Sequence, residues 1–461
     1  MISLPLSEIA QATGGKLVGE DISIEQIGTD SRALNAGDFF LALKGPNFDG
    51  HRFIEQVVEL GCSAVIVDHQ VDCDIPQVVV EDTRIALGKI GAYVKAKVAP
   101  KTVGITGSSG KTTVKEMVAA ILSRLGKVLA TKGNFNNDIG VPLTLLRLEP
   151  QHEYAVIEMG ANHIGEIAYT TALVAPDVAM INNIAAAHLE GFGDLCGVAR
   201  AKGEIYEGLP EGGVAIYNQD CKYAHKWQWR LTDKTVRRFS CAGEASCYSS
   251  NVRLDGSGCA GFTLNTREGQ VDIQLTVPGK HNVCNAVAAA TVTLEMGASL
   301  EDIRLGLAQM TPVNGRLNLL ELKGNCRLID DTYNANVESI KAGIELLDSY
   351  PGVRVLVLGD MGELGSEARS YHQEVGEYAK SQGIDVLFTL GVLSQSTADA
   401  FKENGRHFSS REQLVTTLAQ TLENETGPIS ILVKGSRSAH MEHVVQEIIA
   451  WRNGQPQQEH V

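Results

Sequence analysis

Short apolar runs, separated by segments with helical spacing, recur along most of this chain. Such runs predict buried strands, and the spacing between them predicts amphipathic helices. Buried strands that alternate with helices are typical of a parallel sheet covered on both faces. The pattern therefore predicts an α/β fold. Its central strands are expected at Val103–Thr106, Tyr154–Glu158, Val178–Asn182 and Val214–Asn218.

The pattern before these strands predicts a separate, smaller unit. Residues 63–68 and 77–80 are expected to form strands, and residues 53–60 a helix. Asp82 is a typical helix start and opens the next unit. With 461 residues, the chain has the length of about three domains. We therefore expect an N-terminal domain at 1–82.

The pattern after the central strands predicts a third unit. Residues 222–277 alternate short strands with turns, as in a β insertion, and residues 311–316 have the composition of a linker. Later strands are expected at 354–358, 386–390 and 430–433, with helices between them. We therefore expect a central domain at 83–312 and a second α/β domain, of Rossmann-like type, at 313–461.

The strand ending at Thr106 leads into a loop of small residues, and a helical pattern begins directly after it. Backbone N–H groups in such a loop, and the helix N-terminus, point toward a bound anion. Lys111 is placed to reach the outer phosphates of a nucleotide, and the Thr112 hydroxyl to hold Mg²⁺. Ile105 stands where the usual pattern has its first glycine, so this loop is a short variant. An ordinary turn between strand and helix is the alternative. The predicted phosphate-binding residues are Gly107, Ser108, Ser109, Gly110, Lys111, Thr112 and Thr113.

Polar residues also stand beyond the ends of neighbouring strands. Glu158 ends one predicted strand, and His188 follows the next one. Ligands of an open α/β sheet bind beyond the carboxyl ends of its strands, so both side chains are expected on the edge that carries the small-residue loop. There they could complete a Mg²⁺ shell or bridge two metals. A solvated strand end for Glu158, and a capping or packing role for His188, are the alternatives.

Five further residues have chemistry that the sequence alone leaves open. Lys202 has the setting of a solvated helix lysine. Asn282 and Asn285 open a small-residue helix, where their amides could bind an adenine edge or cap the helix. Asp331 and Lys434 follow strands, where a site or a simple turn is equally consistent.

Composition and charge narrow the class of protein. The net charge of −15 argues against general nucleic-acid binding. No apolar run is long enough to span a bilayer, and Met1–Pro5 lacks the basic segment of a signal peptide. Nine cysteines without C-x-x-C spacing are typical of reduced thiols in a cytosol. We expect a cytoplasmic protein that does not insert into membranes.

These motifs, in this order, resemble the Mur ligases. The shared elements include the T-G-S-S-G-K-T loop, H-N-x-x-N at 281–285, Gly315-Arg316 and D-x-Y-N-A-N at 331–336. The stretches 133–142, 159–163 and 187–193 resemble the subgroup that adds D-alanyl-D-alanine, and the D-N-P-R signature of the diaminopimelate-adding subgroup is missing. The resemblance covers nearly the whole chain. Folylpolyglutamate synthases share the core but not the subgroup stretches.

The resemblance implies a bacterial ATP-dependent ligase of peptidoglycan synthesis. The carboxylate of UDP-N-acetylmuramoyl-tripeptide would attack the γ-phosphate of ATP. The amine of D-Ala-D-Ala would then displace phosphate from the acyl phosphate, giving the UDP-linked pentapeptide. Two Mg²⁺ ions and a monomer are implied, with a UDP-binding, an ATP-binding and a Rossmann-like domain.

The resemblance also assigns site residues. Catalytic roles fall on Lys111, His188 and Lys202, with Lys202 carbamylated so that it becomes a metal ligand. The implied metal ligands are Thr112, Glu158, His188 and Lys202. The ATP contacts added to the loop are Asn282, Asn285, Arg316 and Asp331. The implied UDP-substrate contacts are Ser31, Arg32, Asn47, Asp49 and His51. The implied third-domain contacts are Tyr333, Asn334 and Lys434.

Other functions predict other sequence features. A partner-gated nucleotide switch predicts an N-K-x-D motif, which is missing, and leaves the third domain unexplained. A non-catalytic UDP-sugar-binding protein predicts a degraded phosphate loop, whereas this loop is intact. Another Mur-type or folylpolyglutamate-type ligase with a different amine remains the nearest alternative. We further expect Arg316, Asp331 and Lys434 to reach the Gly110 loop only when the domains close.

Overall fold

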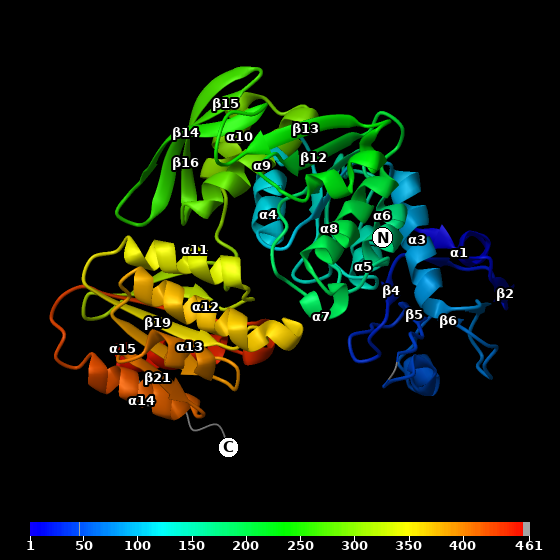
Figure 1. Cartoon of the computed structure of the whole chain (residues 1–461). Helices are drawn as coiled ribbons and strands as arrows, with labels where there is room; N and C mark the ends of the chain where they lie inside the picture. The colour runs from blue at the N-terminus through cyan, green and yellow to red at the C-terminus, as the bar shows by residue number, and fades with distance from the viewer. Residues whose placement is uncertain (46, 455–461) are drawn as a thin grey trace.

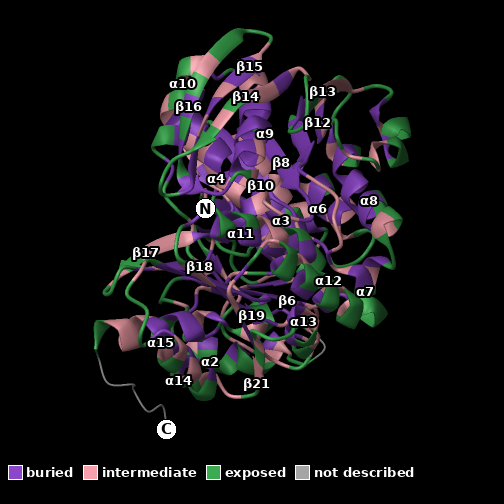
Figure 2. Cartoon of the chain, turned by 60° about the vertical axis from the view of Figure 1, so that its left-hand side comes forward, coloured by how far each residue is buried: buried purple, intermediate pink, exposed green. Residues whose placement is uncertain are grey.

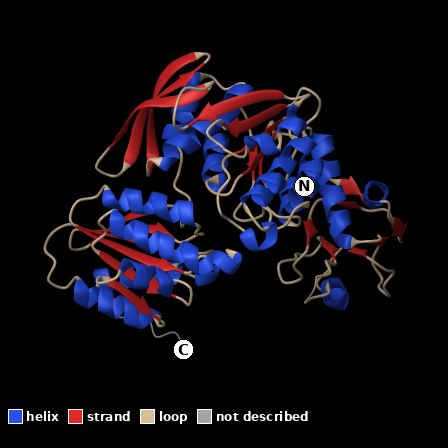
Figure 3. Cartoon of the chain, in the orientation of Figure 1, coloured by secondary structure: helices blue, strands red, loops and turns tan. Residues whose placement is uncertain are grey.

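The chain forms three main sheets, each with its own helices, and the three units are set apart in space (Figure 1). The structure is a computed structural model that describes residues 1–45 and 47–454. Helices and strands alternate through most of it (Figure 3), so the predicted α/β fold is confirmed. Within the described residues, none of the helices has the length and apolar character needed to cross a membrane.

The N-terminal unit is a five-stranded sheet in the order β2-β7-β6-β5-β4, with a short β1-β3 pair beside it. The expected strands at 63–68 and 77–80 are β6 and β7, and the expected helix is a 3-10 turn, Gly50–Phe53, followed by α2. The bounds are β1 Leu4–Pro5, α1 Leu6–Thr13, β2 Lys16–Val18, β3 Ser23–Ile24, β4 Ile27–Gly28, β5 Phe39–Leu41, α2 Ile54–Glu59, β6 Ala64–Val67 and β7 Gln77–Val79.

The middle unit is a nine-stranded sheet in the order β16-β15-β14-β13-β12-β11-β8-β10-β9. β8 to β14 run parallel, whereas β14, β15 and β16 pair antiparallel. The strands of the predicted β insertion thus extend the parallel sheet. The bounds are α3 Thr83–Val98, β8 Lys101–Thr106, α4 Lys111–Leu122, β9 Val128–Ala130, α5 Gly140–Leu145, β10 Tyr154–Glu158, α6 Glu166–Val174, β11 Val178–Ile181, α7 Leu189–Phe192, α8 Leu195–Gly203, β12 Val214–Asn218, β13 Thr235–Ser240, β14 Cys247–Leu254, β15 Cys259–Thr266, β16 Gly269–Pro278, α9 His281–Glu295 and α10 Leu300–Ala308.

Helices cover both faces of this sheet, as continuous apolar strands require. Val156 packs into a core with α4, α9 and α10, while its neighbours Ala155 and Ile157 point into the opposite core with α3, α5 and α6. Buried residues accordingly run along β8 and β12 in Figure 2. The second of these cores also takes in Leu4 and Ile9 of the N-terminal unit, so α3 joins the two units.

The third unit is a six-stranded sheet in the order β17-β18-β22-β19-β20-β21. Only β17 is antiparallel to its neighbour. Irregular backbone at 311–317 connects it to the middle unit, where a linker was expected. The bounds are β17 Asn318–Leu322, β18 Cys326–Asp331, α11 Val337–Asp348, β19 Val353–Gly359, α12 Ala368–Ser381, β20 Val386–Leu390, α13 Gln395–Phe401, β21 Gly405–Phe408, α14 Arg411–Thr421, β22 Ile429–Lys434 and α15 Glu442–Asn453.

The cysteines differ from expectation at one place. Cys241 and Cys284 form a disulfide with their Cα atoms 5.3 Å apart, whereas the other seven cysteines are free. The prediction of nine reduced thiols is therefore wrong for this pair. The two residues are 43 positions apart in sequence, and the fold brings the end of β13 beside the start of α9, which no spacing rule anticipates.

Candidate active site

The small-residue loop lies at the carboxyl end of β8, between the ends of two neighbouring strands. β10 and β11 flank β8 in the sheet, so the residues that follow all three strands meet at one edge. α4 begins at Lys111, directly after Gly110. This places the loop and a helix N-terminus where an anion would be bound.

Two asparagines beyond β11 hold the loop in shape. The backbone N–H of Ser109 donates to Asn183 Oδ1 at 2.8 Å, and Asn183 Nδ2 donates to Ser109 Oγ at 2.9 Å. Asn182 Nδ2 donates to the Ser109 carbonyl at 3.0 Å. Gly110 has φ +73°, and a Cβ there would lie 2.6 Å from Asn285 Oδ1, so the position requires glycine.

The lysine and threonine that follow the loop are both drawn into it. Lys111 Nζ donates to the Gly107 carbonyl at 2.8 Å, and Thr112 is buried. Burial lowers the pKa of the Lys111 ammonium, the Glu158 carboxylate opposes this shift, and Arg316 adds to it. Lys111 is thus a half-buried cation close to Glu158, as a phosphate-binding lysine would be.

Glu158 presents a buried carboxylate oxygen with no partner among the described residues. The side chain is 1% exposed, and Asn136 Nδ2 donates to Oε1 at 2.8 Å. Oε2 is buried and has no hydrogen bond. An uncompensated buried carboxylate is costly, so this oxygen is suited to hold a cation. The alternative of a solvated strand end is excluded.

His188 meets the third unit directly. It precedes α7 with φ +54°, and its Nδ1 lies against the carboxylate of Glu363, which follows β19 and has φ +60°. The Glu190 N–H also donates to the Glu363 carbonyl at 3.3 Å. The imidazole lowers the pKa of the Glu363 carboxyl. His188 therefore links the middle unit to the third.

Lys202 is buried on α8 and is not a solvated helix residue. Its exposed fraction is 1%, and its Nζ lies 5.8 Å from the centre of the Phe192 ring. Burial, with a further contribution from Lys111, lowers the pKa of the Lys202 ammonium well below its ordinary value. No carboxylate among residues 1–45 and 47–454 pairs with it. A neutral amine is the form that can react with CO₂.

The two predicted amides at the start of α9 form a chain that reaches the loop. Asn285 Nδ2 donates to Asn282 Oδ1 at 2.8 Å, and Asn182 Nδ2 donates to Asn285 Oδ1 at 3.1 Å. Both α9 amides are buried and line a cavity of about 330 Å³. Gly110 and Thr113 line the same cavity. The amides are therefore positioned beside the phosphate loop.

Residues of the third unit form the opposite wall of this cavity. Arg316, Asp331 and Lys434 line it together with Gly110. Arg316 Nη2 lies 3.4 Å from Thr112 Oγ1. In this structure the two units are already apposed, so that Arg316 reaches the loop and Asp331 and Lys434 share its cavity.

The charges of this wall are largely paired. Asp331 and Lys434 end neighbouring strands in register, and Lys434 Nζ donates to Asp331 Oδ2 at 2.6 Å. Burial lowers the pKa of Lys434, and Asp331 opposes the shift. The guanidinium of Arg316 stacks 4.2 Å from the Tyr333 ring centre. Arg316 is thus the cation of this wall that faces the loop.

Asn334 lies on the same side and completes the predicted third-domain set. It lines a smaller cavity with Lys111 and Arg316. Its carbonyl accepts a hydrogen bond from Lys434 Nζ at 2.8 Å. Tyr333, Asn334 and Lys434 therefore lie together at the edge of β18 that faces the middle unit.

The predicted UDP-substrate residues remain in two groups in the N-terminal unit. Arg32 is exposed and its guanidinium binds Asp30 at 2.9 Å, while Ser31 beside it is buried. Asp49 caps the 3-10 turn, and His51 Nδ1 lies 2.6 Å from Asp49 Oδ1. Among the described residues no hydrogen bond or ion pair joins these two groups. Asn47 is exposed beside the second group.

Sequence reasoning missed several residues that build the site. Asn182 and Asn183 follow β11, so the strand-end rule that selected Glu158 also applies to them. Asn136 lies in the subgroup stretch 133–142 and had no role assigned. Glu363 carries no signal in the sequence, because its place depends on how two units pack together.

Comparisons with known proteins agree with this architecture. Three family models match the chain: "Mur ligase family, catalytic domain" over residues 23–103, "Mur ligase middle domain" over 105–293, and "Mur ligase, glutamate ligase domain" over 315–437.

Curated relatives match over nearly the whole length. The UDP-N-acetylmuramoyl-tripeptide–D-alanyl-D-alanine ligase of Escherichia coli is 49% identical, with 97% of this chain and 99% of the relative covered. The same ligase of Haemophilus influenzae is 44% identical, with the same coverage.

Solved structures show the same arrangement of units. MurF from Acinetobacter baumannii aligns with a TM-score of 0.93 at 39% identity, covering 97% of this chain and all of that one. MurF from Thermotoga maritima in complex with ADP aligns with a TM-score of 0.84 at 28% identity, covering 93% and 98%. With the phosphate loop, the orphaned carboxylate and the facing third unit in place, these matches establish that the chain belongs to the Mur ligase family.

Proposed function

We propose that this chain joins D-Ala-D-Ala to UDP-N-acetylmuramoyl-tripeptide with the energy of ATP, through an acyl phosphate. The observation that carries the proposal is the cavity in which the Gly110 loop faces Arg316 across the junction of two units. The 49% identity to the E. coli ligase supports the choice of substrates. A carboxylate is a poor acyl donor, and its conversion to an acyl phosphate supplies a good leaving group.

In the first step, the transfer of the γ-phosphate to the tripeptide carboxylate, different residues of the chain have different roles. Loop N–H groups and the α4 N-terminus bind the phosphates, and Lys111 neutralises charge on the transferring group. Arg316 adds positive charge from the opposite wall. Asn282 and Asn285 bind the adenine end of ATP. The tripeptide carboxylate and the γ-phosphate are both anions that must meet. Because these cations are already in place, they lower the activation barrier of this step without any rearrangement of the site.

The residues around Glu158 fit a divalent cation. Its free Oε2 and the Thr112 hydroxyl are oxygen donors, the ligand type that Mg²⁺ prefers. We assign the imidazole of His188 to the same centre, with two ions in all. Bound Mg²⁺ would neutralise charge on the phosphate oxygens.

We further propose that Lys202 reacts with CO₂ to form a carbamate. Its burial and lowered pKa favour the neutral amine that this reaction needs. The amine nitrogen bonds to the carbon of CO₂, a proton leaves, and the side chain becomes an anion. An anion there would relieve the repulsion between Lys202 and Lys111 and offer oxygen ligands to a cation.

The three units take separate roles in this proposal. Residues 1–82 bind the UDP end through Ser31, Arg32, Asn47, Asp49 and His51. Residues 83–312 bind ATP, and residues 313–461 supply Asp331, Tyr333, Asn334 and Lys434 beside the reacting groups. The cavity is built from one chain, which supports a monomer as the active unit. The cytoplasm, where UDP precursors are made, is the proposed location.

Release of ADP tests the proposal directly. ADP should form over repeated turnovers only when ATP, Mg²⁺, the UDP-tripeptide and D-Ala-D-Ala are all present, and mass spectrometry should show the UDP-pentapeptide. Lys111→Ala is the matched control, since it removes the phosphate contact and should lower the rate by orders of magnitude. Repeated turnover that releases ADP at the full rate without the dipeptide, or with a single amino acid in its place, would overturn the assignment.

A further inference from the structure

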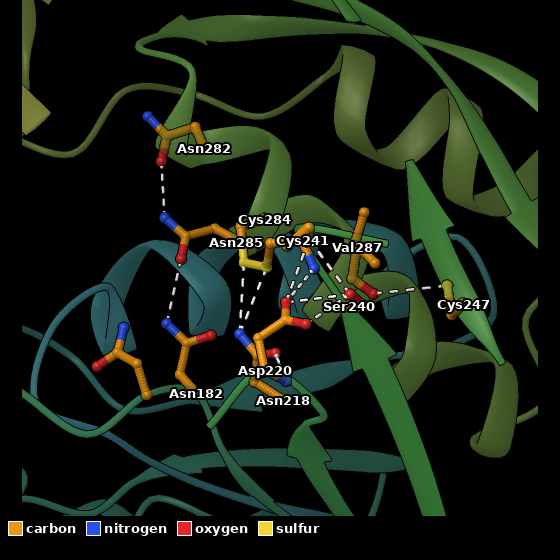
Figure 4. The surroundings of a disulfide bond; sticks show 12 residues. Asn182, Asn218, Asp220, Ser240, Cys241, Cys247, Asn282, Cys284, Asn285 and Val287 are labelled. Atoms are coloured by element: carbon orange, nitrogen blue, oxygen red, sulfur yellow. Dashed lines mark hydrogen bonds between the residues drawn. A yellow bond between two sulfur atoms is a disulfide. The ribbon is translucent and has the colours of Figure 1, made fainter. Parts of the chain in front are cut away.

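The disulfide between Cys241 and Cys284 lies in the wall of the nucleotide cavity. Cys284 is in the first turn of α9, between Asn282 and Asn285, and lines the cavity with them. Cys241 follows β13 and is exposed. Figure 4 shows the pair beside the chain of amides that leads to Asn182. The bond therefore joins the segment after β13 to the helix that we assign to nucleotide binding.

Hydrogen bonds hold the segment after β13 to the end of β12, while α9 packs against β12, β13 and β14 in the core of the middle unit. The N–H of Cys241 donates to Asp220 Oδ2 at 2.8 Å, and Ser240 Oγ donates to the same carboxylate. Asn218 Nδ2 lies 3.5 Å from Cys241 Sγ and 4.0 Å from Cys284 Sγ. Asn218 also lines the cavity. The disulfide thus adds a covalent tie between the segment after β13 and the first turn of α9, which lines the cavity.

We propose that Cys241 and Cys284 are a reversible dithiol–disulfide pair whose oxidation state sets the affinity for the adenine nucleotide. The inference rests on the proposed function, because it concerns the same cavity. In the disulfide form the first turn of α9 and the segment after β13 are fixed relative to each other. A fixed wall loses less freedom on binding, so the disulfide form binds nucleotide more tightly.

The oxidant of this pair is a low-molecular-weight disulfide, which reacts by thiol–disulfide exchange. The helix N-terminus favours the thiolate of Cys284, the form that attacks a disulfide. Its sulfur bonds to one sulfur of the oxidant, whose S–S bond breaks and releases one thiol. Cys241 then attacks the mixed disulfide and releases the second thiol. The protein gives up two electrons and two protons, and one disulfide becomes two thiols.

The free cysteines provide a matched control. Cys196 is exposed like Cys241 but lies at the start of α8 and is not paired. Cys62, Cys247, Cys259 and Cys326 are buried, and burial raises the pKa of each of these thiols. Oxidation by a glutathione buffer is therefore expected to act on the Cys241–Cys284 pair.

The test measures the ADP dissociation constant of the full chain by calorimetry, after equilibration with glutathione disulfide or with dithiothreitol. We expect the oxidised protein to bind ADP roughly three- to tenfold more tightly. Cys241→Ser should bind like the reduced protein under both conditions, and Cys196→Ser should keep the difference. Equal ADP dissociation constants for the oxidised and reduced wild type would overturn this inference but not the proposed function. The same difference in Cys241→Ser would have the same consequence.

A reciprocal measurement needs no variant. Since coupling between two equilibria is mutual, saturating ADP should shift the wild-type pair toward the disulfide by the same factor in a fixed glutathione buffer. Mass spectrometry after alkylation measures the fraction of the Cys241–Cys284 pair that is in the disulfide form. An unchanged disulfide fraction would contradict the inference. A protein that binds no ADP in either state would overturn the proposed function as well.

Discussion

Two amines lie close together, the half-buried Lys111 and the buried Lys202, and the charge on Lys111 disfavours a charge on Lys202. Glu158 is the nearby carboxylate that opposes the shift at Lys111, and its Oε2 has no partner among the described residues. Charges of this kind are costly in a buried site unless they are paired. In the proposed function, phosphates bound at Lys111 and a cation bound at Glu158 would balance these charges. The same burial that costs stability therefore prepares the site for its ligands.

At Lys202 the carbamate predicts a specific chemical rescue. Lys202→Ala removes the proposed anion and should lower turnover by at least about 100-fold. Formate or acetate should restore part of the activity in proportion to its concentration, because a small carboxylate fits the space left. Chloride at equal ionic strength is the control and should restore nothing. An alanine variant with full activity would contradict the carbamate.

At Glu158 the prediction concerns the metal. Glu158→Gln keeps the shape and the Asn136 contact but removes the negative charge. We expect a several-fold higher Mg²⁺ concentration for half-maximal rate, with unchanged affinity for the UDP-tripeptide. Titration of activity with Mg²⁺ measures the first quantity, and calorimetry the second. A wild-type Mg²⁺ requirement would remove Glu158 from the metal centre.

Among the elements, α12 shows how a buried histidine fixes a loop. His372 is 1% exposed, its Nε2 accepts from the Met361 N–H at 3.0 Å, and its Nδ1 donates to the Ala368 carbonyl at 2.7 Å. Burial lowers the pKa of His372 from its ordinary value of 6.5. Only the neutral ring can accept the Met361 hydrogen bond. His372 thereby holds the segment that leads to Glu363.

The sign of the pH effect follows from this lowered pKa. Below pH 6.5 the unfolded chain takes up a proton that the folded chain does not, so the free energy of unfolding falls as the pH falls, until the folded pKa is reached. The slope is at most about 1.4 kcal/mol per pH unit. In denaturant titrations, His372→Gln should show a lower free energy of unfolding at neutral pH but a flatter pH dependence. Parallel curves would contradict the assignment.

At the scale of helices and strands, the sequence predicted much of the fold. The strands β10, β12 and β20 have the predicted bounds, because apolar runs flanked by turns leave little choice of limits. Asp82 caps α3, accepting the N–H groups of Arg84 and Ile85, as expected at a helix start. The edge strand β9 is only three residues long and was not predicted. Its pairing with β10 is a tertiary contact that no local pattern carries.

The candidate site likewise contains some residues that local sequence patterns predict and others that depend on tertiary contacts. The Gly110 loop follows from a local motif, and Glu158 from its place at a strand end. The burial of Lys202 could not be inferred from a helix pattern that is typical of solvent exposure, and only the resemblance pointed to it. The His188–Glu363 contact and the Cys241–Cys284 bond depend on segments far apart in sequence.

At the scale of the whole molecule, the third unit already faces the phosphate loop across a cavity of about 330 Å³. Arg316 contacts Thr112, and His188 and Glu190 contact Glu363, so residues of the middle and third units meet directly at this junction. Closure around ligands would exclude water and bring three reactants into register.

Solution scattering tests this closure. With a non-hydrolysable ATP analogue and UDP-tripeptide together, the radius of gyration should fall relative to the free protein. Either ligand alone should give a smaller change, because each touches only part of the junction. The same radius under all conditions would mean that the junction is fully assembled before the ligands bind.

The central claim is that the tripeptide carboxylate is activated by phosphoryl transfer at this junction. Labelling the terminal carboxylate of the UDP-tripeptide with ¹⁸O follows the oxygen that must leave when the amide forms. The account predicts that this oxygen appears in inorganic phosphate, one for each amide made, while the other stays in the product. Mass spectrometry of the released phosphate measures it. Unlabelled phosphate, or label found in AMP, would contradict the acyl phosphate and the roles assigned to Lys111 and Arg316.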